Sequence, residues 1–211
     1  DVITMGRCSI DLYGQQIGSR LEDMASFAKS VGGSPSNIAI GTARLGLRSG
    51  LITRVGDEQM GRFVLEQMAR EGVSTKGIAT DPARLTSLVL LAVESDKSFP
   101  LIFYRDNCAD SALSEADVSE DFIRSAAALL VTGTHFAREV NDKAQRKAMA
   151  LAKKHGRRIV IDIDYRPNLW GLANHGAGEE RYIKSDMVTS HLQSILADCD
   201  PDAVVSLCVP M

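Results

Sequence analysis

Two arginine residues occupy positions from which they could bind an acidic ligand. Arg105 lies near the end of the strand-like run 99–106 (FPLIFYRD), and Arg166 follows the strand-like run 158–164 (RIVIDID). The planar guanidinium of arginine matches a carboxylate, and open α/β sheets bind ligands beyond the carboxyl ends of their strands. Two other interpretations stay open. Arg105 could be an exposed charge that protects an edge strand, and Arg166, which precedes Pro167, could bond loop carbonyls.

Two aspartates stand shortly before Arg166. Asp162 and Asp164 alternate along one run, so in a continuous strand their side chains point to opposite faces of the sheet. They can serve one site only if the strand has already ended. Asp164, nearer to the strand end, is the candidate site residue, and Asp162 is predicted to accept hydrogen bonds from backbone donors.

The stretch GGSPSNIAIGTARLG, residues 32–46, combines adjacent glycines with small and apolar residues. Gly32 and Gly33 fit neither the dinucleotide fingerprint nor the phosphate-loop motif. They predict a turn with unusual backbone dihedrals, followed by a helix from about Asn37 to Leu45 with Asn37 facing outward. The free N–H groups of such a helix end can hold hydroxyls or an anion. The alternative is tight packing of the helix against a sheet.

Composition argues against several classes of function. The 211 residues carry a net charge of -3 and contain no long basic run, which argues against a nucleic-acid partner. The longest apolar runs, 87–93 and 126–131, are far shorter than a membrane span, and no charged-then-apolar leader opens the sequence. The four cysteines lack close spacing, as is typical of a reducing compartment, and the four histidines lack the spacing of a helical zinc pair. We expect a cytoplasmic protein without a membrane partner and with no metal site in this chain.

Strand-like and helix-like segments alternate along most of the chain. Strands are predicted at 1–6, 51–56, 128–133, 158–164 and 203–209, and helices at 37–45, 57–73, 114–126, 139–154 and 179–196. Ser114 and Asp117 occupy capping-box positions. The runs 86–95 and 99–106 have the spacing of an antiparallel hairpin. We therefore predict one α/β domain with a mostly parallel central sheet, helices on both faces, and a small β lid formed by about residues 9–18 and 86–106.

The glycine-rich stretch, with SIDLYG before it and GLITRVGDEQMGRFVLEQMAREGV after it, resembles the N-terminal signature of the ribokinase-like (PfkB) carbohydrate kinases. The resemblance extends from Asp1 to about Asp200. It implies a ribokinase-like layered fold with the glycine pair at the hinge of the lid, an aspartate on the first lid crossover that binds sugar hydroxyls, and lid strands that can pair in a homodimer. The residues then expected to bind substrate are Asp11, Gly32, Gly33, Asn37, Arg105 and Arg166.

Two further stretches, 102–113 (IFYRDNCADSAL) and 161–171 (IDIDYRPNLWG), are similar to family members that phosphorylate sugar acids. The resemblance implies a sugar-acid substrate and ATP and Mg²⁺ as cofactors. Asp164, because it lies nearer to the strand end, is the candidate for the phosphate side. The family's catalytic aspartate belongs to a Gly-Ala-Gly-Asp motif, whereas here the Gly-Ala-Gly of 176–178 precedes Glu179. We therefore expect no catalytic residue in this chain. The catalytic residues are expected downstream of Met211, and the chain is expected to be inactive alone. The alternative function is a non-catalytic sugar-binding or assembly module that lacks the nucleotide-binding half.

Overall fold

The body of the molecule is built on a six-stranded sheet. The computed structural model describes residues 1–173 and 183–206. In spatial order the strands are β10 (Ala203–Val205), β9 (Arg158–Asp162), β8 (Ala128–Thr132), β1 (Val2–Met5), β4 (Ser49–Gly56) and β5 (Ser74–Asp81). Every neighbouring pair in this sheet is parallel. The predicted α/β class with a mostly parallel sheet is therefore confirmed.

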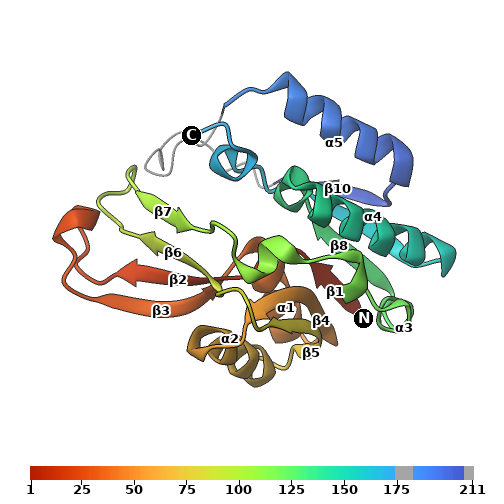
Figure 1. The fold of residues 1–211 in the computed structure, drawn as a ribbon, viewed down its shortest axis with the longest axis horizontal. Helices are drawn as coiled ribbons and strands as arrows, with labels where there is room; N and C mark the ends of the chain where they lie inside the picture. The colour runs from red at the N-terminus through yellow and green to blue at the C-terminus, as the bar shows by residue number, and fades with distance from the viewer. Residues whose placement is uncertain (174–182, 207–211) are drawn as a thin grey trace.

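Helices cover both faces of this sheet, as Figure 1 shows. The α-helices are α1 (Ser34–Arg44), α2 (Gln59–Arg70), α3 (Glu120–Arg124), α4 (Glu139–Lys154) and α5 (Asp186–Cys199). The 3₁₀ turns are η1 (Leu21–Asp23), η2 (Ala109–Ala112), η3 (Glu115–Asp117), η4 (Gly133–Ala137) and η5 (Pro167–Trp170). Side chains alternate along β4, so that Leu51 and Val55 join the apolar cluster under α1 and α2, whereas Ile52 joins the cluster under α4. None of the described helices is both long and apolar enough to cross a membrane.

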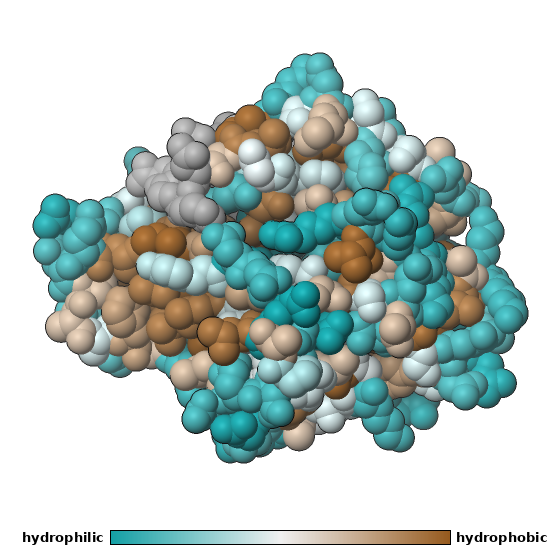
Figure 2. Space-filling view, viewed as in Figure 1, coloured by the Kyte–Doolittle hydropathy of each residue, from teal (hydrophilic) through white to brown (hydrophobic). Residues whose placement is uncertain are grey.

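A second, four-stranded sheet projects to one side of the body, and we call it the lid (Figure 1). In spatial order its strands are β3 (Phe27–Gly32), β2 (Ser9–Gly14), β6 (Ser87–Leu91) and β7 (Leu101–Tyr104). The pair β6–β7 is antiparallel, which confirms the predicted hairpin. Strand β3 was not predicted, and it pairs with β2 along its whole length. Figure 2 shows apolar residues gathered over the lid on the face in view.

Several boundaries differ from the predictions. Helix α1 begins at Ser34 rather than near Asn37, because Pro35 fits the first turn, where its missing N–H is not needed. The segment predicted as one helix at 114–126 forms the short turn η3 and then α3, although the capping box of Ser114 and Asp117 is present. Strand β5 was missed. The predicted helical residues 179–182, the predicted strand residues 207–209, Glu179 and Cys208 lie outside the described residues.

Candidate functional site

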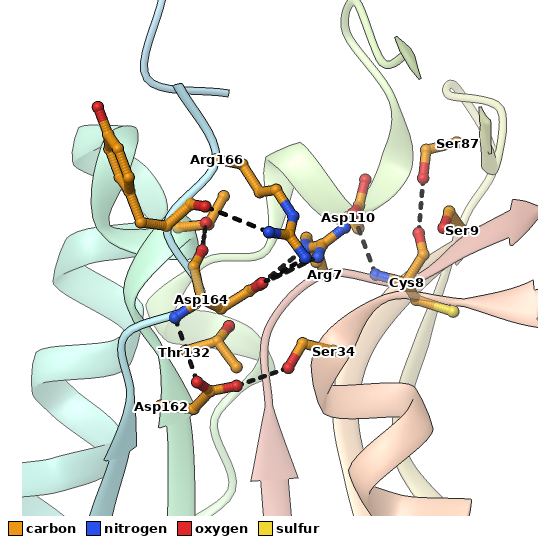
Figure 3. Close-up of polar contacts among 12 residues, drawn as sticks. Arg7, Cys8, Ser9, Ser34, Ser87, Asp110, Thr132, Asp162, Asp164 and Arg166 are labelled. Carbon is orange, nitrogen blue, oxygen red and sulfur yellow. Dashed lines mark hydrogen bonds and ion pairs between the residues drawn. The ribbon is translucent and has the colours of Figure 1, made fainter. Parts of the chain in front are cut away.

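The candidate site lies where the body meets the lid, at the carboxyl ends of three adjacent parallel strands (Figure 3). Strand β1 ends at Met5 and leads through Arg7 into the lid, β8 ends at Thr132, and β9 ends at Asp162. The carboxyl ends of parallel strands lie on the same edge of a sheet. Side chains more than a hundred residues apart in the sequence therefore meet at this edge.

A buried ion pair between Arg7 and Asp164 holds this edge together. The Nε and Nη2 atoms of Arg7 donate to Oδ2 of Asp164 at 3.1 and 3.0 Å, and Nη2 lies 3.3 Å from Oδ1. The side chains are only 7% and 3% exposed. Sequence reasoning missed Arg7, although its position just past a strand end is the same signal that singled out Arg166. Asp164 is thus a partner of arginine, and its assignment to the phosphate side stays a prediction.

Arg166 approaches the same carboxylate from the rim of the site. Its Nη2 lies 3.6 Å from Oδ1 of Asp164, and its side chain is half-exposed. Its Nη1 also donates to the carbonyl of Tyr165 at 3.3 Å, so a bond to a loop carbonyl is present, and a role of Arg166 in binding substrate stays a prediction. Asp164 therefore lies between a buried arginine, Arg7, and a solvent-accessible one (Figure 3).

Asp162 and Asp164 lie together despite their alternating positions. Strand β9 ends at Asp162, and Asp164 has a positive φ of 33°, which breaks the alternation of side chains. The N–H of Asp164 donates to Oδ1 of Asp162 at 3.2 Å, which confirms that Asp162 accepts from a backbone donor. Ser34 at the start of α1 donates to Oδ2 of Asp162 at 2.7 Å. Burial raises the pKa of Asp162, with a smaller rise from the Asp164 carboxylate, while the bonds from Ser34 and the Asp164 N–H oppose the rise.

Gly32 and Gly33 lack a Cβ where other atoms of this chain already fill the space. A Cβ at Gly32 would lie 1.9 Å from Oδ1 of Asp11, and a Cβ at Gly33 would lie 2.5 Å from the carbonyl oxygen of Arg7. Gly33 also has a φ of 98°, which favours glycine, and it caps the N-terminus of α1. Tight packing therefore accounts for both glycines among the described residues.

Asp11 lies on β2, within electrostatic reach of two arginines. Its Oδ1 accepts from the hydroxyl of Ser9 at 2.8 Å. Burial raises the pKa of Asp11, and the Ser9 bond and the charges of Arg7 and Arg105 act against that rise. A carboxylate in this setting can accept hydrogen bonds from the hydroxyls of a ligand.

Arg105 is directed toward Asp110 rather than toward Arg166. Its Nη2 lies 2.7 Å from Oδ2 of Asp110, whose side chain is fully buried, and its Nη1 donates to Ser87 at 3.3 Å. The Arg105 side chain is only 11% exposed, so the interpretation of an exposed edge charge is wrong. The same Asp110 oxygen accepts from the N–H of Cys8 at 3.1 Å, which ties this loop to the start of the lid. The convergence of Arg105 and Arg166 on one ligand stays a prediction.

Asn37 has the exposed position that the sequence predicted. It lies in the first turn of α1, and its backbone N–H donates to the carbonyl of Gly33 at 2.9 Å. No hydrogen bond of the Asn37 side chain is found within residues 1–173 and 183–206. A role in binding substrate stays a prediction for this residue.

Three guanidinium groups and the Asp11 carboxylate lie at the junction of lid and body. Arg7, Arg105 and Arg166 supply guanidinium groups, and Asp11 supplies an acceptor, at one junction of lid and body. Within the part of the chain that the structure describes, no three His, Cys, Asp or Glu side chains gather as ligands of a metal ion. The arrangement suits a polar ligand that carries both a carboxylate and hydroxyls.

Known proteins of similar sequence and structure include several sugar kinases. The family model described as pfkB family carbohydrate kinase matches residues 1–175. A 5-dehydro-2-deoxygluconokinase of Geobacillus kaustophilus is 42% identical over 171 residues, which are 81% of this chain and 51% of that protein. The enzyme of that name in Bacillus subtilis is 40% identical over the same share of this chain and 53% of its own length. The chain thus spans about half the length of the curated relatives it matches.

Solved structures support the same assignment. The PfkB protein from Polaromonas sp. JS666 superposes with a TM-score of 0.82 at 29% identity, covering 95% of this chain and 64% of that one. An uncharacterized sugar kinase from Pyrococcus horikoshii, solved in complex with ATP, superposes with a TM-score of 0.74 at 28% identity, covering 85% and 56%. Because the family model covers most of the residues and these folds superpose, the chain belongs to the pfkB family of carbohydrate kinases.

Proposed function

We propose that the complete protein carrying this chain transfers a phosphate group from ATP to a sugar acid, 5-dehydro-2-deoxygluconate in inositol catabolism. This chain supplies the substrate-binding part. Relatives about 40% identical bear the name of that kinase, and this chain matches about half of each of them. The catalytic residues and the nucleotide pocket then belong to residues outside the described part of this chain.

The junction of lid and body is the observation that carries the proposal. Asp164 holds Arg7 in a buried pair, Arg166 stands at the rim beside that pair, and Asp11 lies near Arg7 on the lid side. A sugar acid presents a carboxylate, which suits a guanidinium, and hydroxyls, which suit an aspartate. A neutral sugar would use only the second of these groups, so the arginines favour an acid.

We include ATP and Mg²⁺ as cofactors in the proposal because the chain belongs to the pfkB family. The Pyrococcus horikoshii sugar kinase was solved in complex with ATP. Within residues 1–173 and 183–206, no three His, Cys, Asp or Glu side chains gather as ligands of a metal ion. We assign none of these residues to Mg²⁺.

The proposal extends to a homodimer formed through lid strands and to a cytoplasmic location, where ATP is available. Tyr13 on β2 and Tyr104 on β7 are 43% and 54% exposed, and Figure 2 shows apolar residues over the lid. Sedimentation of the complete protein tests the dimer. Tyr104→Glu is expected to shift a dimer to monomers, because it replaces an exposed aromatic side chain of a lid strand by a charge, and a dimer that persists contradicts the lid interface.

An ATP-coupled assay of the complete protein tests the activity. We expect turnover with 5-dehydro-2-deoxygluconate, weaker turnover with 2-keto-3-deoxygluconate, and the weakest with fructose. The variant Asp11→Asn is the site control and is expected to lower kcat/KM by about tenfold or more, because a charged hydrogen bond to a substrate hydroxyl is lost. Absence of turnover with all three sugars in a folded protein overturns the kinase proposal. Binding of the acid without turnover would instead support the sugar-binding module.

A further inference from the structure

Four residues close a ring of polar contacts at the root of the lid. Asp110 on η2 has its Oδ2 at 2.7 Å from Nη2 of Arg105, and the same oxygen accepts from the N–H of Cys8 at 3.1 Å. Ser87 donates to the carbonyl of Cys8 at 2.6 Å and accepts from Nη1 of Arg105 at 3.3 Å. Figure 3 shows the two bonds that meet at Cys8. The ring therefore joins the loop after β7 to the starts of β2 and β6 and to η2.

The ring is closed to solvent except at the side chain of Arg105. Cys8, Ser87 and Asp110 are 0% exposed, whereas the side chain of Arg105 is 11% exposed. A guanidinium carries five N–H groups, and the two contacts of Arg105 involve only Nη1 and Nη2. Among the residues with described positions, no further partner of this guanidinium is found. Several of its N–H groups therefore remain for a ligand.

Arg105 also borders a cavity of about 80 Å³ that adjoins the candidate site. The lining of this cavity includes Thr134, whose hydroxyl donates to the carbonyl of Asp164. The charge of Arg105 acts on the carboxylate of Asp11 as well, against the burial that raises the pKa of Asp11. The volume is enough for a group of a few atoms, such as a carboxylate. The guanidinium of Arg105 therefore lies at the same junction as the other candidate site residues.

Asp110 supplies the charge that keeps this guanidinium in place. It is the only carboxylate within ion-pair distance of Arg105 in the part of the chain whose structure is described. An arginine side chain is long and flexible, and a nearly buried guanidinium without a counter-charge would turn toward water. Since the N–H of Cys8 holds Asp110 in turn, Asp110 determines where the guanidinium lies. A ligand that binds an already ordered side chain loses less conformational entropy.

We propose that Asp110 is a positioning residue, which holds Arg105 ready to bind the carboxylate of the sugar acid without touching the acid itself. The inference rests on the proposed function, and it explains how Arg105 would perform its predicted role. Because Asp110 is fully buried, the acid meets the guanidinium and not the Asp110 carboxylate. Asp110 therefore acts on the acid only through Arg105.

A double-mutant cycle in the complete protein tests the inference, with the Kd for 5-dehydro-2-deoxygluconate measured by calorimetry. Asp110→Asn keeps the shape of the side chain and removes its charge, and we expect the Kd to rise about tenfold. Arg105→Met is expected to raise the Kd about tenfold or more. In the Arg105→Met background, Asp110→Asn is expected to have no further effect on the Kd, because the residue through which it acts is gone.

Asp81→Asn is the matched control for loss of a buried, paired carboxylate. Asp81 is 1% exposed, and its Oδ2 lies 3.2 Å from Arg54 and 3.1 Å from Arg84. We expect this variant to lower the urea midpoint, as Asp110→Asn does, but to leave the Kd for the acid unchanged. If Asp110→Asn does not fold, Ser87→Ala repeats the cycle, because it removes the contact to Nη1 of Arg105. The expected rise in Kd is then about threefold, and it too should disappear in the Arg105→Met background.

Calorimetry separates this inference from the kinase proposal, because binding of the acid does not require turnover. Binding without turnover, together with the expected cycle, supports the role of Asp110 while the kinase proposal fails. An equal rise in Kd in both backgrounds overturns the inference, since Asp110 would then act without Arg105. An unchanged Kd in Asp110→Asn or Arg105→Met, an equal rise in Asp81→Asn, or no binding of the acid to the unchanged protein overturns it as well.

Discussion

Replacing Asp164 by asparagine isolates the charge that pairs with Arg7. Asp164 has a φ of 33°, and asparagine tolerates this left-handed region about as well as aspartate, so the backbone keeps its conformation. The substitution removes the carboxylate that neutralises a nearly buried guanidinium. What remains near Arg7 is the more distant charge of Asp11.

The size of the effect follows from the burial of the pair. Removing one partner of a buried ion pair costs about 3–5 kcal/mol, because the other charge stays buried without compensation. We expect the lower end, about 3 kcal/mol, since Asp11 still attracts Arg7 and the amide oxygen of asparagine can accept one of its bonds. Arg7→Met is expected to cost less than Asp164→Asn, because Arg166 remains 3.6 Å from the Asp164 carboxylate and can neutralise it.

Urea unfolding followed by circular dichroism measures the difference. With a slope of about 2 kcal/mol per molar urea, the midpoint of Asp164→Asn should fall by about 1.5 M. Asp200→Asn is the matched control, since Asp200 is exposed, has a φ of 44°, and should shift the free energy of unfolding by less than about 0.5 kcal/mol. If both variants unfold at the same urea concentration, the Arg7–Asp164 pair does not stabilise the junction of lid and body.

Three further predictions concern the glycine pair, the buried histidine and the rim arginine. Gly32→Ala should displace the Asp11 carboxylate, because the new Cβ would lie 1.9 Å from Oδ1. Calorimetry should then show sugar-acid binding weakened about tenfold or more. The control Gly41→Ala, which has open space around it, should bind the sugar acid as the unchanged protein does. Burial lowers the pKa of His135 from 6.5 to about 4 in the folded protein. As the pH falls from 6.5 through 4, the unfolded chain therefore binds a proton at His135 before the folded chain does. The free energy of unfolding should then decrease by up to about 3 kcal/mol. Urea midpoints across that range should decline less in His135→Gln, and an equal decline would contradict this assignment. Arg166→Met should lower kcat/KM for the sugar acid about tenfold and leave that for fructose nearly unchanged, and an equal loss for both would show that Arg166 does not recognise the carboxylate.

Hydrophobic patterns predicted the layered body well, because buried parallel strands and amphipathic helices carry strong periodic signals. Helix α4 runs from Glu139 to Lys154, the bounds expected from the sequence. Strands β3 and β5 were missed, since FAKSVG and STKGIATD have little of the alternation or apolar run that marks a strand. Their positions depend on pairing with β2 and β4, which a local pattern does not show.

The candidate site could be predicted only in part. Asp164 and Arg166 were found because the first lies at the end of a strand-like run and the second just past it, and they do lie together. Arg7 was missed because nothing near it in the sequence shows that its partner is Asp164, 157 residues away. Asp11 came from family resemblance alone. Its carboxylate lies where a Cβ at Gly32 would be, which explains the glycine, and this placement depends on the pairing of β2 with β3.

A crystal structure of the complete protein with 5-dehydro-2-deoxygluconate tests the central claim most directly. We predict that the ligand lies between lid and body, with its carboxylate in hydrogen-bond distance of Arg166 and a hydroxyl in hydrogen-bond distance of Asp11. Density for the acid in the separate hollow lined by Arg54 and Arg84, with Asp11 still bonded only to Ser9, would contradict the proposed sugar-acid site.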